Sequence, residues 1–324
     1  MGSKPPQESL ATLGAIDAAT LHPEPGVYPS VPHFVYHQWR CISNSRLGLL
    51  DRSPLHLKWA LEHDDYDSAA LLLGRATHSA TLEPDDFDAR YSRPGPCVQV
   101  LKSGKNAGAQ CPNGGKRYHL EVGWLCGQHQ GGLDGPWDDS RTVLPVEDYD
   151  AACAIRDNLL AHPSAGTLLR ADGYAELSVV WRDPRTGLRC KARFDKYAPR
   201  YDGGVIADIK TTGDASLQAF ERVVFNRGYF RKAAFYMAGA KAVGLPVQHF
   251  VLLAAENVGP FAVAGYRLTE GAVSAGEEVL AAQLDSYKAC VDSGEWPGYP
   301  AHIQDIAIPA WGYHVIDERL GNGP

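Results

Sequence analysis

The stretch GGVIADIKTTGDAS, residues 203–216, places an acid and a base inside a short apolar strand. Residues 205–209 are apolar except for Asp208, and this pattern predicts a buried strand. Asp208 and Lys210 are two residues apart, so in a strand their side chains lie on the same face. A buried strand that carries an acid beside a base needs a chemical explanation.

This strand is the third of a predicted three-stranded meander. The segment AELSVVW (175–181) has strand composition and is followed by the turn signal RDPRTG. LRCKARFDKY (188–197) forms the second strand, and a turn at 198–204 would fold it back beside the third. The meander therefore brings residues of the second strand close to Asp208 and Lys210.

Asp195, near the end of the second strand, is the residue that the meander would bring to Asp208. Two close carboxylates repel unless a cation lies between them, and Asp carboxylates are hard ligands suited to Mg²⁺ or Mn²⁺. Lys210 would face the same space and stabilise charge on a phosphoryl oxygen. Glu176 on the first strand would add a third carboxylate. The alternative is an exposed Asp208–Lys210 ion pair, which contributes only about 0 to 1 kcal/mol to stability.

Helical patterns occur on both sides of the meander in the sequence. Segments with helical spacing or capping signals are 41–63, divided at Pro54, and 67–82, 147–170, 216–228, 229–244 and 271–293. Two further strands are expected at 249–256 and 261–268. We predict an α/β protein with a mixed central β-sheet flanked by helices and an N-terminal helical layer.

Composition sets the domain organisation and the class of protein. The chain has 324 residues, 44% hydrophobic and 21% charged, as in globular proteins. Residues 1–32 are rich in Pro, Gly, Ser and Ala and predict a flexible arm, and residues 33–324 predict one domain interrupted by an insert at 93–137. The start of the chain does not resemble a signal peptide and no run of eighteen apolar residues occurs, so we expect a cytoplasmic protein that does not bind membranes.

The net charge of −7 means that any contact with nucleic acid must be local. Residues 182–200 contain seven basic residues against two acids. This concentration predicts a DNA-binding surface that includes Arg185, Arg189 and Arg193.

Several blocks of the sequence together resemble a known family. Asp195, twelve further residues and then Asp208-Ile209-Lys210, followed by a helix with KAAFY (232–236), look like the PD-(D/E)XK nuclease core. More specifically, five blocks resemble the exonuclease VIII (RecE-type) family of phage and prophage exonucleases, which are relatives of lambda exonuclease. The blocks are ISNSRLGLLDRSPLHLKWAL (42–61), LGRATHSATLEPDDF (73–87), AELSVVWRDPRTGLRCKARFDKY (175–197), IADIKTTGDASLQAF (206–220) and GEWPGYP…IAIPAWG (294–312).

The resemblance implies roles for individual residues. Asp195 and Asp208 would be metal ligands, and Lys210 would be the catalytic lysine. His78 in GRATH matches the family's upstream histidine near the metals, and Glu176 matches the acidic position of the first core strand.

The family's helix near the active site usually carries a Gln-x-x-x-Tyr pattern. Tyr236 is present, but Lys232 stands where Gln is expected. We therefore expect Lys232 to contact a DNA phosphate in place of the usual polar contact.

The insert is rich in Gly and polar residues and contains Cys97, Cys111, Cys126 and His129. The chain has seven cysteines, an odd number that argues against a disulfide framework. Four soft or borderline ligands suit a closed tetrahedral zinc site, which would hold a segment with little apolar content. The alternative is free cysteines in a flexible loop. Some related nucleases hold an iron–sulfur cluster with cysteines after the catalytic core, but only Cys290 lies there.

The resemblance implies a Mg²⁺- or Mn²⁺-dependent exodeoxyribonuclease that hydrolyses phosphodiester bonds from the ends of double-stranded DNA. Such enzymes usually assemble as rings and often accompany a single-strand annealing protein in phage-type recombination. The alternatives are a non-cleaving recombination accessory protein that binds DNA ends, and a nuclease-like scaffold on which the insert recruits a protein or nucleic acid.

Overall fold

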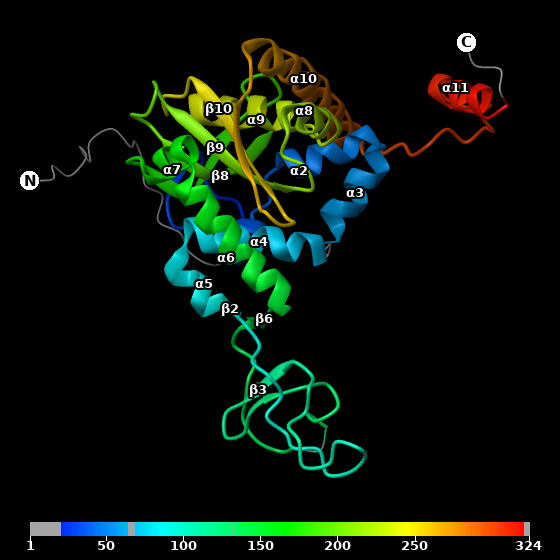
Figure 1. Ribbon diagram of the computed structural model, residues 1–324. Coiled ribbons are helices and arrows are strands. Elements are labelled where there is room, and N and C mark those ends of the chain that lie inside the picture. The colour runs from blue at the N-terminus through cyan, green and yellow to red at the C-terminus, as the bar shows by residue number, and fades with distance from the viewer. Residues whose placement is uncertain (1–20, 64–68, 132, 321–324) are drawn as a thin grey trace, which may run out of the picture.

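A six-stranded sheet forms the centre of the computed structural model, which describes residues 21–63, 69–131 and 133–320 (Figure 1). The strand order is β1-β7-β8-β9-β10-β11, with bounds Gly26–Tyr28, Tyr174–Arg182, Arg189–Ala198, Val205–Thr212, His249–Glu256 and Val263–Arg267. β9 and β10 are parallel, and all other neighbours are antiparallel. The predicted mixed sheet and the β7-β8-β9 meander are therefore confirmed.

Helices cover both faces of this sheet (Figure 1). One face is covered by α4 (Ala69–Leu82), α6 (Val146–Ala161) and α7 (Pro163–Arg170). The other is covered by α9 (Tyr229–Ala242), against which α8 (Leu217–Asn226) and α10 (Glu270–Ser293) pack. β9 is buried from both sides, which explains why its sequence is apolar almost without alternation.

The ends of the helices follow local sequence signals. Pro54 and Pro84 occupy the first turns of α3 (Pro54–Glu62) and α5 (Pro84–Arg90), where proline loses no hydrogen bond. α10 begins where the Thr269 hydroxyl accepts a hydrogen bond from the backbone of Ala272, and it ends at Gly294 with φ of 73°.

Short helices near the N-terminus form the predicted helical layer. They are α1 (His33–Gln38), α2 (Asn44–Leu47), the 3₁₀ helix η1 (Gly48–Asp51) and α3. Contacts of α2 with α9 and of α2 and α3 with α10 hold this layer to the domain. The helix predicted at 67–82 is α4, and residues 67 and 68 lie outside the described residues.

The prediction that residues 1–32 form a flexible arm is wrong for the part that the structure describes. Residues 26–28 form β1, which pairs with β7 at the edge of the sheet and is buried. The buried Lys191 ammonium donates hydrogen bonds to the carbonyls of Tyr36 and Trp39 and so fixes the segment that follows. Residues 1–20 lie outside the described residues.

A small lobe, residues 93–141, projects from the helical side of the domain (Figure 1). It enters and leaves through the parallel strands β2 (Tyr91–Ser92) and β6 (Thr142–Val143). Inside it, β3 (Arg117–His119) pairs with β4 (Gly123–Leu125) and with β5 (Trp137–Asp138). This lobe is the segment predicted as an insert, extended by four residues.

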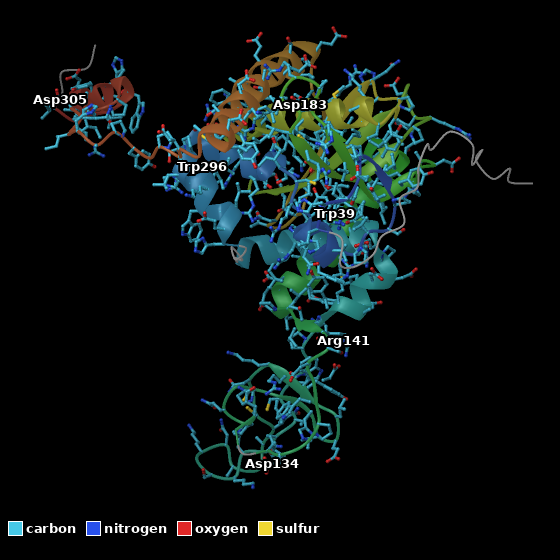
Figure 2. All side chains as sticks on the ribbon, turned by 180° about the vertical axis from the view of Figure 1, so that it is seen from behind. Trp39, Asp134, Arg141, Asp183, Trp296 and Asp305 are labelled. Atoms are coloured by element: carbon cyan, nitrogen blue, oxygen red, sulfur yellow. The ribbon has the colours of Figure 1, made fainter. Side chains whose placement is uncertain are left out.

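The chain leaves the domain again near Trp296 and continues past Asp305 to α11 (Ala310–Arg319), which lies apart from the domain (Figures 1 and 2). This helix was not predicted. Within the described part of the chain, no helix combines the length and apolar character that crossing a membrane requires.

Candidate functional site

Two carboxylates face each other across neighbouring strands of the sheet. Ala175 pairs with Lys196 and Leu177 with Phe194, so Glu176 on β7 lies opposite Asp195 on β8. Like charges at directly opposed positions destabilise a sheet. Glu176 also has φ of 50°, a left-handed conformation that a non-glycine residue rarely adopts. The fold therefore holds two acids at opposed positions, and it holds one of them, Glu176, in an unfavourable backbone conformation.

Asp195 lies where β8 and β9 stop pairing. Their last paired residues toward this end are Lys196 and Ala207. Beyond that point the Asp195 Oδ2 atom accepts a hydrogen bond of 2.7 Å from the backbone N–H of Ile209. The Asp195 side chain thus replaces a strand-to-strand hydrogen bond, and its position is fixed by the backbone of β9.

His78 on α4 completes this group. Its Nδ1 atom lies 3.5 Å from Asp195 Oδ2 and 4.0 Å from Glu176 Oε1. Its Nε2 atom lies 3.0 Å from the carbonyl oxygen of Ile209. Because a carbonyl only accepts, Nε2 carries the proton of the neutral ring, and the lone pair of Nδ1 faces the two carboxylates.

The ligand atoms of His78, Glu176 and Asp195 all lie within 4.8 Å of one another, and we call these three residues the core cluster. An imidazole lone pair with two carboxylates suits Mg²⁺ or Mn²⁺. The hydrogen bond that fixes the orientation of the His78 ring is typical of a metal ligand. The residues present therefore fit a divalent metal ion.

Asp208 is fully buried next to this cluster, and each of its oxygens contacts an ammonium group. Lys210, on the same strand, contacts Oδ2, and Lys232 on α9 contacts Oδ1. Lys210 also donates a hydrogen bond of 3.0 Å to the carbonyl of Ile209. The predicted residues Asp195, Asp208 and Lys210 thus lie at one end of the sheet, but Asp208 contacts lysines rather than the core cluster.

The electrostatics of these carboxyl groups differ. Burial and the nearby Asp195 carboxylate raise the pKa of Glu176 to about 8. Burial also opposes ionisation of Asp208, but the charges of Lys210 and Lys232 hold its pKa well below the usual range. Asp208 is therefore a stable anion between two cations. Arg193 lies 3.8 Å from Glu176, but its charge does not outweigh burial and the nearby Asp195 carboxylate, so a metal ion would stabilise the ionised form of Glu176.

The remaining predicted residues lie at various distances from this site. The Tyr236 ring is buried under the Lys232 ammonium, 4.8 Å from it, so it supports the lysine. Arg193 lies 3.8 Å from Glu176 and donates hydrogen bonds to Ser178 and to the carbonyl of Val31. This contact joins the N-terminal segment to the core cluster. The sequence carries no signal for it, because the composition of residues 1–32, which include Val31, predicts a flexible arm.

Two other arginines that were predicted to bind DNA are engaged within the chain. Arg185 forms an ion pair of 2.9 Å with Asp285 on α10 and donates to the carbonyl of Ala281. Arg189 lies 3.6 Å from Glu24. Both lie near the turn between β7 and β8, at the opposite end of these strands from Glu176.

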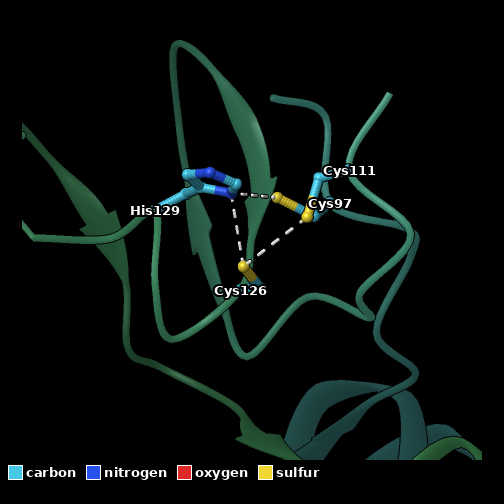
Figure 3. Close-up of side chains that lie close together, drawn as sticks. All are labelled: Cys97, Cys111, Cys126 and His129. Atoms are coloured by element: carbon cyan, nitrogen blue, oxygen red, sulfur yellow. Dashed lines mark hydrogen bonds between the residues drawn. The ribbon is translucent and has the colours of Figure 1, made fainter. Parts of the chain in front are cut away.

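In the lobe, the four predicted ligands come together (Figure 3). His129 Nδ1 lies 3.4 Å from Cys97 Sγ and 3.3 Å from Cys126 Sγ, and Cys111 Sγ lies 3.9 Å from Cys126 Sγ. A tetrahedral zinc site with Zn–S of about 2.3 Å and Zn–N of about 2.0 Å separates its ligand atoms by roughly 3.5 to 3.8 Å. We call these four residues the lobe cluster, and their spacing fits zinc.

Other properties of the lobe cluster agree with metal binding. All seven cysteines of the chain are free, so no disulfide competes for these sulfurs. Burial raises the pKa of Cys126, but backbone N–H groups of Gln128 and His129 outweigh it and lower that pKa to about 6. The thiolate, which is the form that binds metals, is thereby favoured.

A protein-family model matches most of the chain. Residues 43–307 match the model of a PDDEXK-like domain of unknown function (DUF3799). The chain belongs to this family. The match confirms the PD-(D/E)XK resemblance, and the mixed sheet flanked by helices is consistent with the fold of that family. The closer resemblance to the RecE-type family stays a prediction. A search of curated proteins gave no match.

A solved structure has the same fold. The crystal structure of a "Putative exonuclease" from Eubacterium rectale is 14% identical to this chain, covers 84% of it and 92% of its own chain, and has a TM-score of 0.52. A second crystal structure, of SSO0001, is also 14% identical and covers 39% of this chain and 58% of its own. Its TM-score of 0.25 is too low to support an argument.

Proposed function

We propose that this PDDEXK-like protein is a metal-dependent deoxyribonuclease that hydrolyses phosphodiester bonds from the ends of double-stranded DNA. The observation that carries the proposal is the core cluster, in which the Nδ1 atom of His78 lies 4.0 Å from Glu176 Oε1 and 3.5 Å from Asp195 Oδ2. Lys210 lies beside it on a strand that Asp195 also contacts. The name of the Eubacterium rectale protein supports an exonuclease.

The residues divide the chemistry between them. A divalent ion held by the core cluster would polarise the phosphodiester and activate water. Lys210, oriented by Asp208 and by the carbonyl of Ile209, would supply the positive charge that stabilises the negative charge developing on the phosphate. Lys232 neutralises the second oxygen of Asp208, so that this carboxylate orients lysines instead of attracting a second ion.

The preference for duplex ends, the ring assembly and the annealing partner derive from the resemblance to RecE-type enzymes. They are expectations for this chain. Size-exclusion chromatography with light scattering would give the number of subunits directly.

The test is to incubate end-labelled linear duplex and covalently closed circular duplex with Mg²⁺, Mn²⁺ or EDTA. We expect mononucleotides or short products from the linear DNA only, and only with a divalent ion. Cleavage of the circle would replace the exonuclease proposal by an endonuclease. Binding of ends without any cleavage would support the non-cleaving accessory protein.

We also propose that the lobe cluster holds one structural zinc ion. All four ligand positions come from the chain, so no position is left open for a substrate. Elemental analysis of protein purified without added metal should give about one zinc per chain. An absorbance band near 400 nm would instead support an iron–sulfur cluster.

A further inference from the structure

Three lysines on the lobe are exposed to solvent. Lys102, Lys105 and Lys116 lie in loops before β3, and we call them the lobe lysines. Within the described chain, no carboxylate lies within ion-pair distance of any of them. Between Arg93 and Leu120 the sequence has five basic residues and no acid, although the whole chain has a net charge of −7. Their positive charge is therefore not cancelled locally.

The arginines of the lobe differ from its lysines. Arg117 pairs with Asp139 and stacks on Trp137, with its guanidinium carbon 4.4 Å from the ring centre. Arg141 pairs with Asp138. The arginines thus help to hold the lobe together, and the lysines are the cations that it leaves to solvent.

The tip that carries two of these lysines is shaped for close approach. Residues 102–109 are all small or polar apart from the two lysines. Gly104 and Gly108 both have φ of 87°, and a Cβ atom added at either would have no neighbour within 4 Å. A phosphate backbone can therefore reach Lys102 and Lys105 without meeting a bulky side chain.

The lobe is held in a defined position relative to the domain. Its two connecting segments pair as β2 and β6. Arg93, the first residue of the lobe, forms a two-pronged ion pair with Asp150 on α6, with distances of 2.6 and 2.8 Å. α6 packs on α4, the helix that carries His78. The lobe lysines are thus presented from the same helical layer as one ligand of the core cluster.

We propose that the lobe is a DNA-contacting arm whose lysines 102, 105 and 116 bind the phosphate backbone of the duplex that the core cleaves. This inference rests on the proposed deoxyribonuclease function. The lobe cluster would serve to fix the shape of the arm. A closed metal site gives a lobe with little apolar content the rigidity to present its cations.

The test compares two triple variants with the same change of charge. The variant Lys102→Gln, Lys105→Gln, Lys116→Gln is set beside Lys58→Gln, Lys241→Gln, Lys288→Gln, whose residues lie on α3, α9 and α10. Binding of a labelled 30-base-pair duplex is titrated by fluorescence anisotropy in Ca²⁺ at several salt concentrations. Hydrolysis of bis(p-nitrophenyl) phosphate, which is too small to reach the lobe, is measured in Mn²⁺.

For the lobe variant we expect binding at least tenfold weaker and a salt slope lower in magnitude by about 2 to 3, since each phosphate contact contributes about 0.9. The control variant should change either quantity far less, and hydrolysis of the small phosphodiester should be equal in all three proteins. Equal effects of both variants, or unchanged binding by the lobe variant, would overturn the inference. Unchanged binding would instead suggest that the lobe binds a protein partner through its exposed apolar side chains Val98, Val100 and Leu120. If none of the three proteins hydrolyses the small phosphodiester in Mn²⁺ or linear duplex DNA in Mg²⁺ or Mn²⁺, the proposed function fails while the binding comparison still stands.

Discussion

The core cluster and the lobe cluster each bring ligating side chains to one point, with opposite chemistry. The core cluster offers an imidazole and two carboxylates on a sheet and a helix, and its acids repel each other. The lobe cluster offers three sulfurs and an imidazole from loops, at distances close to those of a filled tetrahedron. Hard oxygen ligands suit Mg²⁺ and Mn²⁺, and thiolates suit zinc.

The difference between these clusters separates a site built for reaction from a site built for shape. The core cluster has three ligands from the chain, beside two lysines that point at a buried carboxylate. It leaves coordination positions for water and phosphate. The lobe cluster has four ligands and leaves none. Removing a ligand should therefore affect activity in the core and structure in the lobe.

The largest effect should follow from Asp195→Asn. Asn keeps the shape and can still accept the hydrogen bond from Ile209, but it removes a charge from the core cluster. We expect DNA cleavage to fall by at least about 10²-fold, as when an electrostatic group of an active site is deleted. At a pH above about 8, where Glu176 is ionised, the melting temperature of the metal-free protein should stay the same or rise, because repulsion from Glu176 is relieved.

Single-turnover degradation of linear duplex and thermal melts in EDTA measure both effects. Asp208→Asn is the matched control. This substitution leaves the Lys210 and Lys232 ammonium groups without the carboxylate that they share. Because removing one partner of a buried ion pair is destabilising, it should lower the melting temperature as well as the cleavage rate. Near-normal cleavage by Asp195→Asn would show that the core cluster is not the active site.

Cys126→Ser tests the expectation that removing a ligand of the lobe cluster affects structure rather than activity. We expect zinc to fall from about one per chain to nearly none and the lobe to lose its fixed structure, since so small a segment depends on its metal. Hydrolysis of bis(p-nitrophenyl) phosphate by the core should persist. Elemental analysis and limited proteolysis report the lobe, with Cys153→Ser on α6 as the control. Retained zinc in Cys126→Ser would contradict the assignment of this ligand.

Much of the fold could be predicted because its signals are local. Turn signals at both ends of β8 defined the meander, and helical spacing located α4, α6, α9 and α10. β1 was missed because three residues between prolines carry no pattern, and their strand forms only by pairing with β7. The order of strands beyond the meander also depends on tertiary contacts that no local signal reports.

The candidate site was predicted as a set of residues and not as an arrangement. Acids and a base inside apolar strands identified Asp195, Asp208, Lys210 and Glu176, and the family resemblance added His78. The sequence could not show the left-handed backbone of Glu176, or that Asp208 would contact two lysines instead of the core cluster. That division depends on where β8 and β9 separate and on the reach of Lys232 from α9.

Lys232→Gln sharpens the comparison, because Lys232 brings a positive charge to the position where the RecE-type resemblance predicts a neutral glutamine. The variant removes the positive charge that lies beside Asp208. The core should then bind Mn²⁺ about tenfold more tightly, a difference of roughly 1.4 kcal/mol in binding free energy. Calorimetry on zinc-loaded, DNA-free protein measures this affinity, and Lys232→Arg, which keeps the charge, should leave it near the wild-type value. Weaker or unchanged Mn²⁺ binding by Lys232→Gln would mean that Lys232 does not compete with a metal ion.

The smallest effect should come from substituting Arg185 and Arg189, the two arginines of residues 182–200 that the sequence predicts to bind DNA and that form ion pairs within the chain. Arg185 is held by Asp285 and by the Ala281 carbonyl, and Arg189 lies near Glu24, so binding phosphate would require breaking these contacts. For the double variant Arg185→Ala, Arg189→Ala we expect the salt slope of duplex binding to change by less than about 0.9, the value of one phosphate contact. Asp285→Ala is the matched control: it frees Arg185, so binding should strengthen if this surface lies near DNA. If the magnitude of the salt slope falls by about 1.8 in the double variant, Arg185 and Arg189 contact DNA despite their ion pairs within the chain. The basic residues of the core and the lobe lysines would then not differ in their availability to DNA.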